Sequence, residues 1–134
     1  MHLTGACFCG SIKYEIVHYA SDMVDYCHCR QCRQASGAPV LAWVQVTPER
    51  FKLTSGVAKP FASSAHATRW FCPDCGSQLY MTDSQGVSVG VTLGTLDTPE
   101  AVRPTAHGWE SERLGWFCVA DGLPRYAQAP PYDL

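Results

Sequence analysis

Residues 72–76 read Cys-Pro-Asp-Cys-Gly and form the strongest local motif of the chain. They resemble a zinc knuckle, because the proline sets a turn, two residues separate the sulfurs, and the glycine lets backbone amides point at the thiolates. A closed structural zinc site has four ligands, so a second pair of cysteines is needed. Residues 7–10, Cys-Phe-Cys-Gly, are also a bare pair followed by glycine. We therefore assign four ligands to one zinc ion: Cys7, Cys9, Cys72 and Cys75.

This assignment would decide the fold, because it joins the N-terminal edge of the chain to its middle. Residues 10–71 lie between the two pairs. Bringing the ends of so long a loop together costs conformational entropy, and the free energy of metal binding offsets that cost. The zinc ion of this site is accordingly expected to be structural.

The remaining clustered cysteines lie in residues 27–32, Cys-His-Cys-Arg-Gln-Cys. Sulfurs this close in sequence can cap one face of a metal ion but leave its fourth corner open, which is typical of catalytic zinc. The sequence therefore predicts two zinc ions per chain, one structural and one catalytic, with Cys27, Cys29 and Cys32 at the second. The alternative is a fourth ligand that closes this site, and the candidates are Cys118, His28, His66 and His107.

Two of these candidates have a simpler interpretation. His28 lies between two ligand cysteines, so its side chain is expected to point the other way. Cys118 lies in an apolar run, residues 116–119, and is expected in the core, since a free cysteine behaves as a small hydrophobic residue. The open site with three ligands is thus the favoured interpretation.

Composition limits the class of protein. The chain has 134 residues, of which 46% are hydrophobic and 16% charged, so it can form one domain with a packed core. Its formal net charge of -2 argues against a nucleic-acid partner, since nucleic-acid-binding proteins usually carry a basic excess. No apolar run reaches the length of a membrane span, so no membrane association is expected.

The N-terminal residues lack the charged region and apolar stretch of a secretory signal peptide, which predicts a cytoplasmic protein. In that compartment, clustered cysteines indicate metal binding rather than disulfides. A disulfide scaffold is the alternative, although a Cys-x-Cys pair cannot easily close on itself.

The pattern of apolar residues predicts an all-β domain of many short strands with little helix. Apolar and polar residues alternate in residues 12–16, and turn residues separate further β-rich runs. The expected strands are residues 12–16, 40–46, 51–54, 69–71, 78–81, 87–93 and 116–119. Residues 29–36 are the expected helix. The Pro-rich tail, residues 127–134, is expected to fray or to lie extended over the surface.

The group of three cysteines favours a particular chemistry. A zinc ion with three thiolate ligands carries a net charge of about -1, which makes it a poor Lewis acid toward water. It is better suited to holding a fourth thiol as a thiolate. A thiolate held there could attack an aldehyde or leave from a thiohemiacetal. The site therefore favours the chemistry of a small thiol over peptide hydrolysis.

Several motifs occur together and in the order typical of one protein family. They are Gly5-Ala6-Cys7-Phe8-Cys9-Gly10-Ser11; Cys27-His28-Cys29-Arg30-Gln31-Cys32-Arg33 followed by Gly37-Ala38; Arg69-Trp70-Phe71-Cys72-Pro73-Asp74-Cys75-Gly76-Ser77; Gly94-Thr95-Leu96-Asp97; and Asp121-Gly122-Leu123-Pro124. By these motifs the chain resembles the glutathione-dependent formaldehyde-activating enzyme family, which also includes centromere protein V. Family members commonly have histidine where this chain has Phe8, a position that is not a ligand.

The resemblance implies a zinc-containing fold of antiparallel strands, called a β-tent, over residues 3–126. It also implies the same division of the cysteines between a structural and a second zinc ion. The family's namesake activity adds glutathione to formaldehyde to give S-hydroxymethylglutathione, and it is classed as a carbon–sulfur lyase activity. The implied partners are a small thiol such as glutathione and an aldehyde, and a homo-oligomer is left open.

Several other polar residues have two interpretations each. Arg30, Arg33 and Arg69 lie beside cluster cysteines, where they would bind substrate carboxylates or compensate thiolate charge, or else lie solvated at the surface. His66 and His107 are candidate acid–base groups near the second zinc, or ordinary hydrogen-bonded histidines.

An enzyme is the first hypothesis for the function of the chain. The alternative is a zinc-stabilised binding module without catalysis, in which both metals are structural. A thiol redox sensor that uses the cysteines of residues 27–32 is a third hypothesis, and metal binding would suppress it.

Overall fold

The structure is a computed structural model that describes residues 1–134 except 18, 20–22 and 133. Its strands are β1 (Leu3–Ala6), β2 (Lys13–Ile16), β3 (Val24–Cys27), β4 (Leu41–Val46), β5 (Phe51–Ser55), β6 (Lys59–Ala62), β7 (Ala67–Phe71), β8 (Gln78–Asp83), β9 (Val89–Thr92) and β10 (Ala106–Gly108). The α-helix is α1 (Arg30–Ser36), and four short 3-10 turns complete the regular structure. No helix among the described residues is long and apolar enough to cross a membrane.

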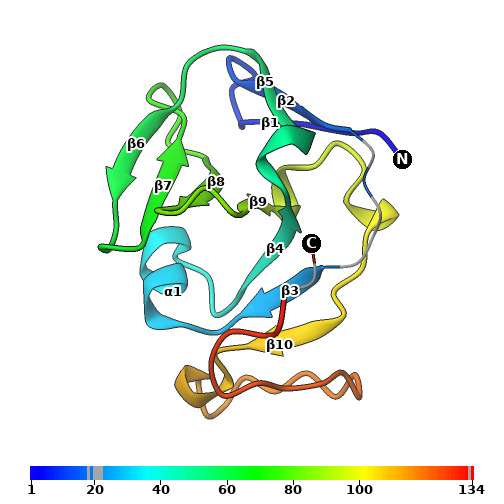
Figure 1. The fold of residues 1–134 in the computed structure, drawn as a ribbon. Helices are drawn as coiled ribbons and strands as arrows, with labels where there is room; N and C mark the ends of the chain where they lie inside the picture. Colours follow the sequence, from blue (N-terminus) through cyan, green and yellow to red (C-terminus); the bar gives the residue numbers. More distant parts are fainter. Residues whose placement is uncertain (18, 20–22, 133) are drawn as a thin grey trace.

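The strands form two sheets (Figure 1). The smaller has the order β1-β2-β5, and the larger has the order β10-β3-β4-β9-β8-β7-β6. The prediction of an all-β fold with many short strands and little helix is confirmed. The pairs of described strands are antiparallel with one exception. β10 runs parallel to β3, whereas the prediction was of antiparallel strands. A parallel pair needs a long connection, and nearly eighty residues of chain separate these two strands.

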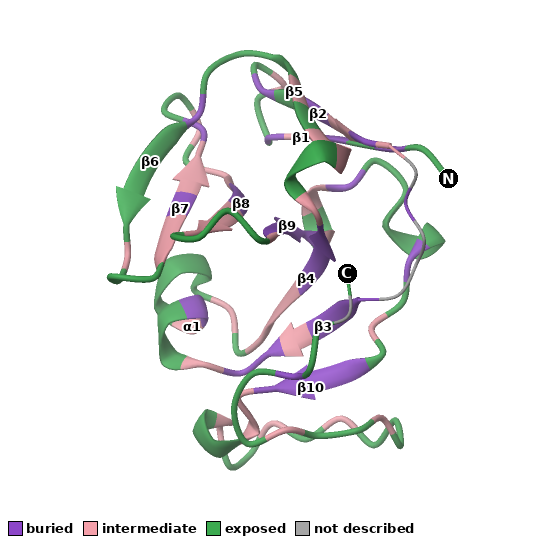
Figure 2. Cartoon of the chain, in the orientation of Figure 1, coloured by how far each residue is buried: buried purple, intermediate pink, exposed green. Residues whose placement is uncertain are grey.

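The main hydrophobic core lies between the two sheets. The smaller sheet contributes Leu3, Tyr14 and Ile16, and the larger contributes Val44 and Val91. These side chains are almost fully buried, and Figure 2 shows β9 and the second half of β4 as buried. The smaller sheet therefore covers one face of the larger one.

The opposite face of the larger sheet carries a second set of side chains. Because side chains alternate along a strand, Trp43 and Gln45 of β4 point away from the face that carries Val44. Asp25 of β3 pairs with Trp43, and Met81 of β8 pairs with the same glycine of β9 as Gln45 does. This face forms the floor of the pocket described below.

Most predicted strands lie where the alternation placed them, and one does not exist. Residues 116–119 are a loop rather than a strand, and Cys118 is exposed rather than in the core. Trp116 is also 75% exposed. The apolar run was misread because apolar residues alone do not make a strand, and among the described residues this segment pairs with no strand.

Candidate metal centres and the adjoining pocket

The structure gathers four of the predicted ligand cysteines into one group, which we call the quartet. The sulfurs of Cys7, Cys9, Cys72 and Cys75 all lie within 4.8 Å of one another, and none of them forms a disulfide. The Sγ atoms of Cys7 and Cys9 are 3.6 Å apart, and those of Cys9 and Cys72 are 3.8 Å apart. These separations are too long for S–S bonds, but they suit sulfurs that surround one metal ion.

Two glycine-ended turns create the quartet. Gly76 has a φ of 79° and Gly10 a φ of 82°, a left-handed conformation that glycine adopts without strain. The amide of Gly76 donates to the carbonyl of Cys72, so the second turn closes on itself. The turns thereby hold each pair of sulfurs on the same side of the backbone.

Polar groups around the quartet stabilise thiolates. The amide of Ile12 donates to Cys7 Sγ at 3.3 Å, and the hydroxyl of Ser11 lies 3.2 Å from Cys9 Sγ. The contact with Ser77 lowers the pKa of the Cys75 thiol to about 6. A site with polar partners for its sulfurs, in which the sulfurs meet without bonding, fits a metal ion.

The structure also gathers the other three predicted ligands, which we call the triplet. Cys27 ends β3, Cys29 is the N-cap of α1, and Cys32 lies in the first turn of that helix. Their sulfurs lie within 4.8 Å of one another, with 3.4 Å between those of Cys27 and Cys32. Cys29 Sγ also accepts a hydrogen bond from the amide of Cys32, so the cap of the helix fixes its position.

The thiols of the triplet do not share one pKa. The contact with Cys27 lowers the pKa of Cys29, whereas the contact with Cys29 raises the pKa of Cys27. The first proton therefore leaves easily, and the others are retained because adjacent thiolates repel each other. A cation would remove that repulsion. The guanidinium of Arg69 provides part of this positive charge, since its two terminal nitrogens lie 3.6 Å and 3.7 Å from Cys32 Sγ.

The side chain of His28 points away from the triplet and contacts β10 and the C-terminal region. Its Nε2 lies 2.8 Å from Nδ1 of His107, whose Nε2 lies 2.8 Å from a carboxylate oxygen of Asp121. Glu110 approaches the same His28 nitrogen at 3.5 Å. Burial lowers the pKa of His28. The buried imidazole pair thus connects the loop that carries Cys27 and Cys29 to β10 and the C-terminal region.

The described residues provide no fourth ligand atom to the triplet. Cys118 is exposed, and His107 is committed to His28 and Asp121. His66 is exposed and lines the neighbouring pocket. All seven predicted ligands therefore lie in a group of four and a group of three, and a zinc ion in each group stays a prediction.

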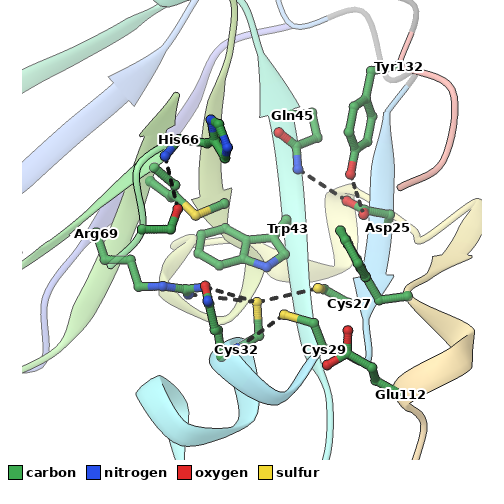
Figure 3. Close-up of a pocket in the computed structure, with 15 residues that line it drawn as sticks. Asp25, Cys27, Cys29, Cys32, Trp43, Gln45, His66, Arg69, Glu112 and Tyr132 are labelled. Carbon is green, nitrogen blue, oxygen red and sulfur yellow. Dashed lines mark hydrogen bonds between the residues drawn. The ribbon is translucent and has the colours of Figure 1, made fainter. Parts of the chain in front are cut away.

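The triplet opens onto a pocket of about 380 Å³ (Figure 3). Its wall includes four residues from the face of the larger sheet that points away from the smaller sheet: Trp43, Gln45, Met81 and Arg69. The Arg69 guanidinium carbon lies 5.9 Å from the centre of the Trp43 ring. The indole N–H of Trp43 is buried without a hydrogen-bond partner. The pocket thus has an apolar floor with a small number of oriented polar groups, as ligand sites generally do.

One arginine of the three named from the sequence lines this pocket. Arg33 donates to the backbone carbonyls of His28 and Glu112, so it supports the loop structure. Arg30 is exposed and lies with Arg33 beside a different surface hollow. Arg69 is therefore the arginine placed to act on the triplet or on a ligand.

Asp25 and Tyr132 are among the pocket residues that sequence reasoning missed. Asp25 is 1% exposed and accepts hydrogen bonds from Gln45 Nε2 at 3.3 Å and from the hydroxyl of Tyr132 at 3.0 Å. Burial raises the pKa of Asp25 to about 6, although both hydrogen bonds oppose that change. Its spacing was an available signal, because a residue two positions before Cys27 shares the same face of a strand.

Comparison with known proteins identifies the family. The model of the family described as "Glutathione-dependent formaldehyde-activating enzyme" matches residues 2–112. The chain belongs to this family. The resemblance inferred from the sequence motifs is therefore confirmed.

A curated relative and a solved structure agree with this placement. The chain is 30% identical over 82 residues to an uncharacterized lyase of Schizosaccharomyces pombe, a match that covers 61% of this chain and 58% of that protein's length. A crystal structure of a Rhodobacter sphaeroides protein covers 70% of this chain and 87% of its own, with a TM-score of 0.57 and 21% identity. The relative is itself named as a lyase, and the solved structure supports the fold alone.

Proposed function

We propose that the chain is a carbon–sulfur lyase-type enzyme that makes or breaks the adduct of a small thiol, such as glutathione, with an aldehyde. The observation that carries this proposal is the open side of the triplet. Three cysteine sulfurs converge, no described residue provides a fourth ligand atom, and the open side faces a pocket. A metal centre that served only to hold the fold would need neither feature.

In this proposal, Cys27, Cys29 and Cys32 hold a zinc ion, and the quartet holds another. The zinc ion of the triplet would keep an external thiol deprotonated at neutral pH. Arg69 would act beside it, because its guanidinium compensates the negative charge of the Cys32 thiolate. The buried position of Arg69 keeps that interaction from being screened by water.

The reaction itself is balanced without a redox partner. In the forward direction, the sulfur of the thiol bonds to the carbonyl carbon, and the carbonyl oxygen takes up the proton that the thiol lost. The reverse reaction breaks the C–S bond and returns the proton to the sulfur. Trp43 lines the pocket and its buried indole N–H has no hydrogen-bond partner, so in this proposal a shift of the ring would let it donate to the oxygen as charge develops there.

Titration of the zinc-loaded protein with glutathione and other small thiols tests the proposal. The expected result is one thiol bound per chain and faster equilibration of the thiol with an aldehyde. Replacement of Cys29 by serine should abolish both, while Cys118→Ser, at an exposed cysteine outside either group, should change neither. A protein that binds no thiol and does not accelerate adduct formation would instead fit the alternative, a binding module with two structural metals.

A further inference from the structure

The C-terminal tail is anchored beside the pocket rather than free. The amide of Tyr126 donates to the carbonyl of His107, and the amide of Trp109 donates to the carbonyl of Gln128. Further along, Pro130 is buried against Gly108, where an added Cβ atom would lie 2.8 Å from Pro130 Cδ. The tail thus follows β10, which pairs with β3. It lies beyond residue 112, where the family match ends.

This course brings Tyr132 into the pocket wall (Figure 3). Its hydroxyl donates to Oδ2 of Asp25, and Gln45 Nε2 donates to Oδ1 of the same carboxylate. Both donors are therefore directed at Asp25. What remains available to a ligand is the phenol oxygen of Tyr132, which can only accept a hydrogen bond, and the amide of Gln45, whose oxygen accepts and whose second N–H can still donate.

The charged groups of the pocket are unevenly distributed. The acidic groups of the lining are Asp25 and Glu112. The guanidinium of Arg69 is directed at the sulfur of Cys32, on the side of the triplet. Figure 3 places Trp43 between these two ends of the pocket, with Asp25 and Tyr132 together at one end. Among the described residues, that end presents the Asp25 carboxylate and the acceptor atoms of its neighbours but no cation.

We propose that Asp25, Gln45 and Tyr132 form a subsite for a hydrogen-bond-donating group of the thiol substrate, best an ammonium group. Aminothiols are then favoured over thiols that carry a carboxylate at the same distance from sulfur. This inference rests on the proposed function, since it concerns the far end of the thiol bound at the triplet. In this proposal Tyr132 is a specificity residue, because it forms part of the subsite. It lies in a segment outside the family match, so the subsite is a feature of this chain rather than of the matched family region.

Three thiols of similar length test the subsite: cysteamine, 2-mercaptoethanol and 3-mercaptopropionate. Their dissociation constants are measured by calorimetry on the zinc-loaded full-length protein. The thiols differ in intrinsic acidity, so the quantity compared is the ratio of the 3-mercaptopropionate constant to the cysteamine constant, protein against protein. In that comparison the intrinsic differences cancel.

The ratio is expected to fall at least fivefold in Tyr132→Phe and in Asp25→Asn relative to the unmodified protein. Tyr126→Phe is the matched control, because Tyr126 belongs to the same tail but does not line the pocket, and its ratio should not change. An unchanged ratio in both Tyr132→Phe and Asp25→Asn overturns the subsite while leaving the proposed function intact. Failure of the unmodified protein to bind any of the three thiols overturns the proposed function and the subsite with it.

Discussion

The two cysteine groups use the same ligand type but are built in opposite ways. The quartet joins two turns from distant parts of the chain, and Cys7 and Cys72 belong to the main hydrophobic core. The triplet comes from one loop and the helix that follows it, and it packs with Trp43 in a separate, smaller cluster. The quartet therefore holds tertiary structure together, whereas tertiary structure holds the triplet in place.

The difference shows how the origin of the ligands affects the role of a site. The turns of the quartet provide their own polar partners, Ser11 and Ser77. The triplet depends on residues far away in sequence, among them Arg69 and His107. A local set of sulfurs leaves one side unoccupied by protein, and distant residues can then shape that side into a pocket.

The largest effect is expected from a change in the quartet. In Cys75→Ser the site loses one of its four ligands. Structural zinc sites contribute roughly 10 kcal/mol or more to folding, which is about the whole stability of a typical domain. The variant should therefore be unfolded at 25 °C by near-UV circular dichroism. A folded Cys75→Ser protein would remove the basis for the contrast between the two groups.

A smaller but still large effect is expected from crowding the sheet next to the quartet. In Gly5→Ala, the added Cβ would lie 2.2 Å from Tyr14 Cζ and 2.6 Å from the carbonyl oxygen of Thr95. We expect a loss of about 3 kcal/mol or more in the free energy of unfolding, measured by urea titration.

Gly90→Ala is the counterpart in the pocket. Its nearest contacts would be 3.2 Å, to Gln45 Oε1 and to the Trp43 ring, and the Gln45 side chain can move. The loss should be about 1 kcal/mol. Equal losses in Gly5→Ala and Gly90→Ala would mean that the two regions are packed with the same rigidity.

The buried tyrosine of the smaller sheet predicts a pH dependence. Burial raises the pKa of Tyr14 from 10.0 to about 12. Between these values the unfolded chain releases the proton while the folded protein retains it, so stability falls as pH rises from 10 to 12. The loss from this group is roughly 2–3 kcal/mol. The difference between the stability curves of the unmodified protein and Tyr14→Phe isolates it, and parallel curves would rule it out.

The smallest effect on stability is expected in the triplet. In Cys29→Ser, the new hydroxyl can still cap α1, because serine is a good N-cap residue. The melting temperature should change by less than about 5 °C. The zinc content should nevertheless fall from two ions per chain to one by elemental analysis. A loss of both ions, or a collapse of the fold, would contradict the separation of the two sites.

The sequence was sufficient to predict much of this arrangement. The cysteine spacing assigned seven residues to groups of four and three, and the structure gathers the same residues. Strands with clear alternation, such as β2 and β4, lie within one residue of their predicted ranges. These features depend on local spacing, which sequence records directly.

The missed strands lack such a local signal. β6 contains Pro60, and proline is tolerated there because β6 is an edge strand of the larger sheet. β3 contains the buried Asp25, which breaks the apolar pattern. Only the tertiary contact with Tyr132 and Gln45 explains a carboxylate at that position. The pocket was not predicted because its residues meet only after the larger sheet forms.

The anchored tail also has a consequence for how the protein is made. The last residue of the quartet is Cys75, and the last residue of the pocket wall is Tyr132, 57 residues later (132 − 75). A ribosome that adds roughly 5–20 residues per second needs about 3–11 seconds for that stretch. The metal that organises the core can thus be captured several seconds before the segment that completes the described pocket wall is synthesised.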